Sequence, residues 1–217
     1  MIEINKYIDH TLLRATATEE EVANLCREAA EYEFFSVCVN SSFVSFAKEQ
    51  LKGTDVKVCA VVGFPLGAMS TPAKVFEAEQ AVKEGATEID MVINLGALKS
   101  RQLEKVEQEI RAIKEAIGEN VLKVILETCY LTPEEILLGS ELSVKAGTDF
   151  VKTSTGFGTA GADKESIELM KKATEGKAKI KASGGIKNLD TALYYIELGV
   201  ERIGTSSGIS IVKELRA

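Results

Sequence analysis

Two lysines and one aspartate stand in apolar runs, where a charged side chain is costly to bury. Lys152 lies in DFVKTST, Lys181 in AKIKASGG and Asp90 in TEIDMVIN. A lysine amine attacks a carbonyl only as the neutral base, and a neighbouring ammonium or loss of water lowers its pKa. The two lysines therefore predict a Schiff-base nucleophile beside a cationic partner. Asp90 would accept a proton or hold a proton-relaying water.

Each lysine also has a plain structural interpretation, in which its stem lies along the core and its charge reaches water. Three ionisable residues at similar depth in three separate runs favour one joint site over three independent side chains. Asp90, Lys152 and Lys181 are therefore the candidate catalytic residues. Their types alone leave open which lysine is the nucleophile.

The segments that follow three of the apolar runs are rich in glycine and hydroxyl residues. Glycine lets backbone N–H groups approach an anion closely, and serine or threonine adds a hydroxyl donor. The same residue types build ordinary strand-to-helix turns, but three such clusters beside two lysines favour a phosphate site. The candidate phosphate-binding residues are Thr155, Gly156, Gly184, Gly185, Ser206 and Ser207.

Four further residues are weaker candidates. Asp9 is predicted to accept a hydrogen bond at the barrel mouth as part of the substrate site, with an N-terminal cap role as the alternative. His10 should face the opposite way and serve a structural role. Glu127, near the end of its run, is predicted to face inward and to pair with a lysine. Cys38 is predicted to pack in the core rather than to act as a nucleophile.

Short strand-like runs recur eight times, near residues 8, 37, 60, 91, 125, 152, 181 and 204. Amphipathic segments lie between many of them, and several begin with threonine or proline and end with glycine. Regular alternation of this kind implies parallel strands with helical crossovers. We therefore predict a single (β/α)8 barrel of the α/β class. An open doubly wound sheet is the alternative, weakened because no G-x-G-x-x-G follows the first run.

Strand alternation orients the three catalytic candidates. In TEIDMVIN, Ile89 and Met91 share one face, which suits the helix-covered outside of a barrel, so Asp90 should point inward. The same argument turns Lys152 and Lys181 inward. The working end of such a barrel is the carboxyl end of its strands.

Composition excludes several classes of protein. The 217 residues hold 26 Lys and Arg against 33 Asp and Glu, so the net charge of −7 argues against a nucleic-acid partner. No run approaches 18 apolar residues, so we expect no membrane span. The N-terminal MIEINKYIDH lacks the pattern of a signal peptide, and a cytoplasmic location is expected. No linker interrupts the chain, which predicts one catalytic domain over residues 1–217.

Few residues are available for metal binding or hydrolysis. His10 is the single histidine, and the four cysteines are scattered without a C-x-x-C pair, which makes a zinc site a poor interpretation. A Mg²⁺ site made of carboxylates alone stays open. The cysteines are expected to be reduced thiols, with Cys38 and Cys59 buried.

The combination of IDHTLL, EIDMVIN, FVKTSTGF and KASGGI with the GTSSG turn resembles the deoxyribose-phosphate aldolase family, over nearly the whole chain and in the family's order. The resemblance implies a metal-independent class I aldolase with no cofactor, on a (β/α)8 barrel. Its reaction would be the reversible cleavage of 2-deoxy-D-ribose 5-phosphate to acetaldehyde and D-glyceraldehyde 3-phosphate. It further implies a homo-oligomer, either a dimer or a tetramer.

The resemblance also implies a role for each motif residue. Lys152 matches the family's Schiff-base nucleophile, Lys181 the second catalytic lysine and Asp90 the proton-relay carboxylate. Two departures stand out. Phe157 occupies a position where some members carry a phosphate-contacting lysine, and some members have a longer tail ending in tyrosine, where this sequence ends at Ala217.

Two rival functions share parts of this pattern. Another Schiff-base phosphosugar aldolase or transaldolase on the same barrel would keep the lysine and choose a different acceptor. A non-catalytic phosphosugar-binding barrel would bind phosphate esters without covalent trapping. A substrate panel separates the first rival, and borohydride trapping separates the second.

Overall fold

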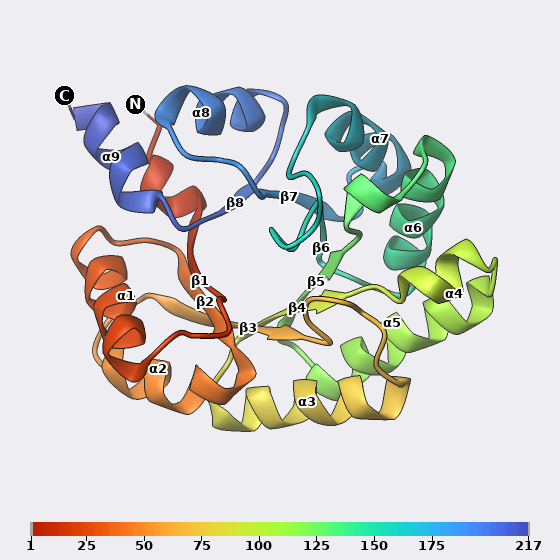
Figure 1. Ribbon diagram of the computed structural model, residues 1–217, viewed down its shortest axis with the longest axis horizontal. Helices are drawn as coiled ribbons and strands as arrows, with labels where there is room; N and C mark the ends of the chain where they lie inside the picture. The colour runs from red at the N-terminus through yellow and green to blue at the C-terminus, as the bar shows by residue number, and fades with distance from the viewer. Residues whose placement is uncertain (1, 217) are drawn as a thin grey trace.

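Eight parallel strands close into a barrel in the order β1 to β8, and helices surround it (Figure 1). We describe a computed structural model covering residues 2–216, so the end of the sequence at Ala217 lies outside the described residues. The last strand pairs with the first, with Asp9 of β1 opposite Gly204 of β8. This closure confirms the predicted (β/α)8 barrel, and the open-sheet alternative is wrong.

The strands are short, as expected for a small barrel. Their bounds are β1 Ile8–Leu12, β2 Ser36–Asn40, β3 Lys57–Val62, β4 Glu88–Val92, β5 Val121–Ile125, β6 Phe150–Lys152, β7 Lys179–Ser183 and β8 Arg202–Thr205. The helices are α1 Glu19–Glu31, α2 Val44–Gln50, α3 Thr71–Glu84, α4 Leu95–Lys99, α5 Leu103–Ile117, α6 Pro133–Lys145, α7 Lys164–Thr174, α8 Leu189–Glu197 and α9 Gly208–Arg216.

The helix boundaries follow from local capping chemistry. Thr18 caps α1 and Thr132 caps α6, each in a capping box with the glutamate three residues later. Helix α3 has a proline in its first turn and ends at Gly85, whose φ of 113° is a conformation that glycine adopts readily. These signals are the ones that predicted the long helices from the sequence.

Three short or terminal helices, α2, α4 and α9, were not predicted. Helix α2 has seven residues and no side-chain cap, and α4 has five residues, so neither carries enough periodicity to be recognised.

Among residues 2–216 there is no helix that combines the length and the apolarity needed to cross a bilayer.

The inside of the barrel holds buried charges beside a small apolar cluster, and the layer outside it is apolar. Residues such as Ile89, Met91 and Val151 face the helices and belong to one large buried cluster. The alternate positions carry charge into the barrel, where Asp90, Lys123 and Lys181 have no exposed surface. Branched apolar residues usually fill the interior of such a barrel. Here several of those positions carry charged side chains, which indicates a functional role for the buried charges.

Candidate active site

Three lysine amines converge on the carboxylate of Asp90. The Nζ atoms of Lys152 and Lys181 lie 2.7 and 2.8 Å from Oδ2, and that of Lys123 lies 2.9 Å from Oδ1. The strand register accounts for this convergence, because Lys152 stands opposite Lys181 in the β6–β7 pair. The structure therefore brings together the three residues selected from the sequence and adds a fourth.

Lys123 is the residue that sequence reasoning missed. It lies opposite Asp90 in the β4–β5 pair, inside the barrel. The signal was present, since in VLKVI the apolar Leu122 and Val124 alternate with Lys123 as the neighbours of Asp90 do. It also contacts Glu88, with Nζ 2.5 Å from Oε2.

Asp9 was predicted to lie at the barrel mouth, and this placement is wrong. Its side chain is fully buried in the barrel and accepts hydrogen bonds from Ser36 Oγ at 2.7 Å and from the Arg202 guanidinium at 2.7 Å. Its second oxygen is 2.5 Å from Lys181 Nζ. Asp9 therefore contacts Lys181 inside the barrel and does not line the substrate pocket.

These contacts fix the charge states of the buried groups. Burial alone would raise the pKa of the Asp90 carboxyl, but Lys123, Lys152 and Lys181 outweigh it and hold that pKa well below its ordinary value. Burial would lower the pKa of Lys181, but Asp9 and Asp90 outweigh it and raise that pKa. The pKa of Lys123 is raised in the same way, against burial, chiefly by Asp90. Lys123 and Lys181 are thus held as cations.

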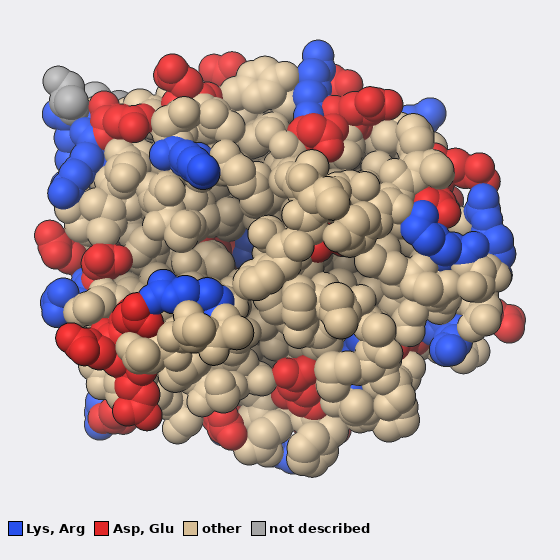
Figure 2. Space-filling view, in the orientation of Figure 1, with Lys and Arg blue, Asp and Glu red and all other residues tan. Residues whose placement is uncertain are grey.

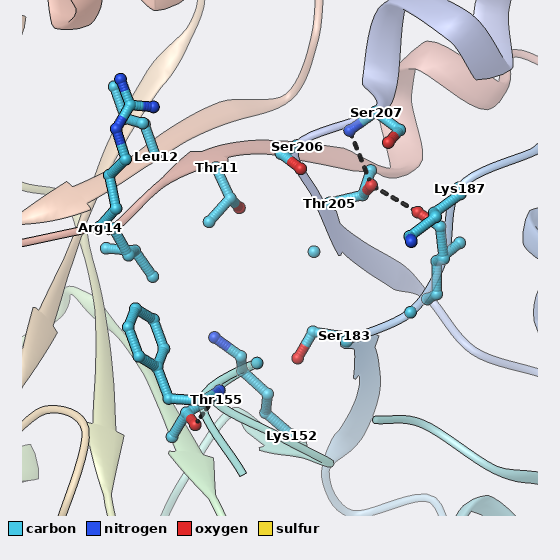
Figure 3. Close-up of a pocket in the computed structure, with 17 residues that line it drawn as sticks. Thr11, Leu12, Arg14, Lys152, Thr155, Ser183, Lys187, Thr205, Ser206 and Ser207 are labelled. Atoms are coloured by element: carbon cyan, nitrogen blue, oxygen red, sulfur yellow. Dashed lines mark hydrogen bonds between the residues drawn. The ribbon is translucent and has the colours of Figure 1, made fainter. Parts of the chain in front are cut away.

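A pocket of about 350 Å³ opens at the carboxyl ends of β1, β6, β7 and β8. Figure 2 shows the face that carries it, hollowed near the centre and flanked by basic side chains. Lys152 lines this pocket and is 3% exposed, whereas Lys123 and Lys181 are completely buried. In Figure 3 the amine of Lys152 points into the cavity. Of the three lysines on Asp90, Lys152 is the one that lines this pocket.

All six predicted phosphate residues line this same pocket, namely Thr155, Gly156, Gly184, Gly185, Ser206 and Ser207. The pocket also includes basic and hydroxyl residues that the sequence analysis did not select, namely Thr11, Arg14, Ser183, Lys187 and Thr205. Lys187 directly follows KASGGI, and a basic residue close to two glycines could have identified it as a phosphate-binding candidate. Arg14 and Lys187 stand on opposite sides of the cavity in Figure 3.

The loops around the pocket are tied to one another. Thr205 Oγ1 donates to the Ile186 carbonyl at 2.6 Å and accepts from the Ser207 N–H at 2.9 Å, which joins the loop after β8 to the loop after β7 (Figure 3). Gly184 approaches Gly161 so closely that a Cβ on Gly161 would lie 2.2 Å from the Gly184 carbonyl oxygen. The glycines of these loops are therefore held in place by the fold itself.

Glycine at position 204 makes room for the buried lysine. A Cβ there would lie 2.9 Å from Ser183 Cβ and 3.1 Å from Lys181 Cε. The barrel therefore has space for the Lys181 stem because β8 supplies no side chain at this point.

The weaker candidates have mixed outcomes. The prediction that Glu127 pairs with a lysine is wrong, because its backbone is left-handed at φ 53° and its carboxylate accepts from the N–H and the hydroxyl of Thr155. His10 is structural, as predicted, since it turns outward to Glu28 at 2.8 Å. Cys38 and Cys59 are buried free thiols, also as predicted.

Cys38, Cys59 and Asp90 form the one cluster of possible metal ligands among residues 2–216, with ligand atoms within 4.8 Å of one another. Their chemistry does not suit a cation. Both oxygens of Asp90 already contact ammonium groups, and burial raises the pKa of Cys59 well above the ordinary thiol value. The Cys59 thiol and a carboxylate already paired with lysines are therefore poor ligands for a metal.

Comparison with known proteins places this site in a family. The family model described as DeoC/LacD family aldolase matches residues 4–214. The chain belongs to this aldolase family. Like other DeoC/LacD family aldolases, it is an enzyme that acts on carbon–carbon bonds. A lysine that lines a pocket, as Lys152 does, is consistent with this chemistry.

Named relatives of the DeoC/LacD family match along nearly the whole chain. The deoxyribose-phosphate aldolase of Finegoldia magna is 55% identical over 212 residues, covering 98% of this chain and 100% of that protein. The one from Brevibacillus brevis is 55% identical over 211 residues, covering 97% and 96%.

A solved structure agrees with the fold. That of deoxyribose phosphate aldolase from Aeropyrum pernix, described as a unique tetramer, superposes with a TM-score of 0.89 at 36% identity. It covers 99% of this chain and 91% of that one.

Proposed function

We propose that this enzyme cleaves 2-deoxy-D-ribose 5-phosphate reversibly to acetaldehyde and D-glyceraldehyde 3-phosphate, with Lys152 as the Schiff-base nucleophile. One observation carries the assignment. Three lysines contact Asp90, but Lys123 and Lys181 are fully buried and each contacts two carboxylates, whereas Lys152 contacts Asp90 alone and lines the pocket. The names of the close relatives supply the substrate.

The first half of the reaction forms the covalent intermediate. The neutral amine of Lys152 attacks C1 of the open-chain sugar, and loss of water from the resulting carbinolamine gives an iminium ion. Asp90, which lies 2.7 Å from the amine, orients it, and a water held beside Asp90 carries away the proton released in this step. The iminium then accepts the electron pair of the C2–C3 bond as the C3 hydroxyl gives its proton to the water beside Asp90.

The second half releases both products. Breaking the C2–C3 bond leaves D-glyceraldehyde 3-phosphate and an enamine of acetaldehyde on Lys152. A proton delivered to C2, by a water held beside Asp90 and the Lys181 ammonium, regenerates the iminium. Hydrolysis of the iminium frees acetaldehyde and restores the lysine.

The phosphate is assigned to the loops that follow β7 and β8. Gly184, Gly185 and Ser206 present backbone and hydroxyl donors there, and Lys187 supplies a cation. Phe157 itself packs edge-on against Phe64, with ring centroids 5.3 Å apart, and so forms an apolar side of the pocket.

Borohydride trapping tests the proposal. The enzyme is incubated with acetaldehyde in EDTA, reduced, digested and mapped by mass spectrometry. A reduced two-carbon adduct on the Lys152 peptide is expected in the wild type, and none in Lys152→Leu. Lys187→Met serves as the control, since it removes another pocket lysine and should keep the adduct. An adduct on Lys181 would contradict the assignment of roles, and no adduct on folded protein would favour the non-catalytic binding barrel.

We also propose that the enzyme works as a homo-oligomer, as its relative from Aeropyrum pernix is described to do. Large apolar side chains on and before α3 support this, since Leu66 is 74% and Phe76 68% exposed. Light scattering coupled to size-exclusion chromatography distinguishes a monomer from a dimer or tetramer.

A further inference from the structure

Six buried charges beneath the pocket form a closed ring in which acids and bases alternate. Asp90 contacts Lys123 at 2.9 Å, and Lys123 contacts Glu88 at 2.5 Å. Glu88 contacts Arg202 at 3.1 Å, and Arg202 contacts Asp9 at 2.7 Å. Asp9 contacts Lys181 at 2.5 Å, and Lys181 returns to Asp90 at 2.8 Å. The ring joins strands β1, β4, β5, β7 and β8.

Water screens this ring very little. Asp9, Asp90, Lys123 and Lys181 have no exposed surface, and Glu88 and Arg202 are 3% and 5% exposed. Charges in such surroundings act on one another over longer distances than surface charges do. A change of charge at the floor of the barrel is therefore felt at its top.

The ring is neutral without Lys152. Its three carboxylates match its three cations, so a protonated Lys152 would be a fourth cation sharing the one carboxylate of Asp90 with two others. Other titratable groups lie nearby. Cys38 and Cys59 are buried free cysteines, and the Glu127 carboxylate accepts from the Thr155 N–H. Two more basic residues, Arg14 and Lys187, lie on the pocket wall, and Arg14 forms an ion pair with Glu21.

We propose that Glu88 and Arg202 are positioning residues for the aldol reaction, which set the charge of the Lys152 amine through the ring without touching the substrate. Glu88 lies one inward position below Asp90 on β4, and Arg202 stands opposite Lys181 in the β7–β8 pair. Neither lines the substrate pocket. The inference rests on the proposed role of Lys152.

The structure holds the Arg202 charge firmly at the barrel floor. Its guanidinium carbon lies 3.4 Å from the ring centroid of Phe35 and 5.3 Å from that of Phe150, so two aromatic faces add to its ion pairs. Both of its terminal nitrogens contact Glu88. A planar, always charged group suits this place better than lysine would.

The test is the pH dependence of Schiff-base formation, measured as the rate of borohydride-trapped acetaldehyde adduct on Lys152 in the full chain. Glu88→Gln removes an anion, which favours the neutral amine, so the midpoint of the pH profile should move down by about one pH unit. Arg202→Met removes a cation, which favours the ammonium, so the midpoint should move up by about the same amount. Two substitutions in one ion pair thus predict shifts of opposite sign.

Three further variants separate tuning from mere packing. The double variant Glu88→Gln with Arg202→Met restores the charge balance, so its midpoint should return to that of the wild type. Glu88→Asp and Arg202→Lys keep the charges and should keep the midpoint, even where the rate falls. Circular dichroism at each pH confirms that the compared proteins are folded.

Several outcomes overturn the inference. Shifts of the same sign, or slower trapping with an unmoved midpoint in both single variants, would show that the pair only packs the barrel floor. Failure of both single variants to fold would show the same, because the ring would then serve stability. The wild type separates this inference from the proposed function, since absence of a Lys152 adduct there would overturn the latter first.

Discussion

Two buried lysines in this molecule, Lys74 and Lys152, show what makes an amine available for chemistry. Lys74 is completely buried between α3 and α5, with Nζ 2.6 Å from the Glu109 carboxylate and 2.9 Å from the Val92 carbonyl. Burial lowers its pKa, against the opposing effect of Glu109. Lys152 is almost as buried, but it shares its carboxylate with two other cations and lines the pocket.

The comparison teaches that burial of a lysine does not by itself create a nucleophile. Lys74 has one acid to itself and does not line the substrate pocket, so its pair joins two helices and performs no reaction. Lys152 stands where cations outnumber the nearest carboxylate and where a carbonyl can approach. Surplus cationic charge and access together mark the reactive amine.

The largest expected effect separates the two lysines directly. Lys152→Leu should lower turnover of deoxyribose 5-phosphate by on the order of 10⁴-fold or more, because no other pocket amine is placed against Asp90. The melting temperature should change little. A coupled assay for glyceraldehyde 3-phosphate and a thermal melt provide the two readings, and activity close to wild type would contradict the assignment.

Asp90→Asn should lower turnover by roughly 10² to 10⁴-fold, the range for loss of a group that moves protons. It also leaves three buried ammonium groups without their shared acid, so the protein should unfold at lower urea concentration. Steady-state kinetics and urea titration measure the two effects. If kcat stays within a few-fold of wild type, proton relay does not pass through this carboxylate.

Lys74→Met should show the converse behaviour, with stability lost and chemistry retained. Removing one partner of a buried ion pair costs about 3–5 kcal/mol, because the Glu109 carboxylate is left unpaired. The trapped adduct on Lys152 should form at the wild-type rate in the folded protein. The double variant Lys74→Met with Glu109→Leu is the control and should recover much of the loss in chemical denaturation.

Lys187→Met tests the outer wall of the pocket. One charge-assisted hydrogen bond is worth about 1.5–3 kcal/mol, so KM for the phosphorylated sugar should rise about tenfold or more with kcat little changed. Cleavage of unphosphorylated deoxyribose should be unaffected, which makes it the matched control substrate. An equal loss on both substrates would place Lys187 outside the phosphate site.

The smallest expected effect concerns pH and stability. The pKa values of Asp9 and Asp90 are held below the ordinary value, so their contribution is complete above about pH 4 and is lost as the pH falls further. The pKa values of Lys123 and Lys181 are raised, so their contribution persists until strongly alkaline pH. Melting temperatures should be flat from about pH 5 to pH 9 and fall below about pH 4. A shallower acid decline in Asp90→Asn would support this origin.

Much of the fold was predictable because it follows local rules. Period-two alternation oriented Asp90, Lys152 and Lys181, and capping residues such as Thr18 and Thr132 set the ends of the long helices. Lys123 follows the same alternation, so its inward orientation could also have been predicted from the sequence. The glycine and serine loops of the pocket were recognised because anion binding needs few residue types.

The rest depended on contacts between distant parts of the chain. Asp9 and Arg202 meet across 193 positions of sequence, and no local pattern links them. Glu127 was misjudged because its left-handed backbone breaks the alternation that the prediction assumed. Such single-residue departures are set by the packing of the finished barrel.

The closed ring of alternating charges also constrains how this interior can evolve. A random substitution of one ring member leaves a lone charge in a dry interior, whereas a matched change of neighbouring acid and base does not. These six positions should therefore change rarely one at a time, because selection removes the unpaired intermediate, and should change in acid–base pairs when they change at all. Mutational libraries aimed at the barrel interior should encode acid and base changes together, while the pocket loops can be varied one residue at a time.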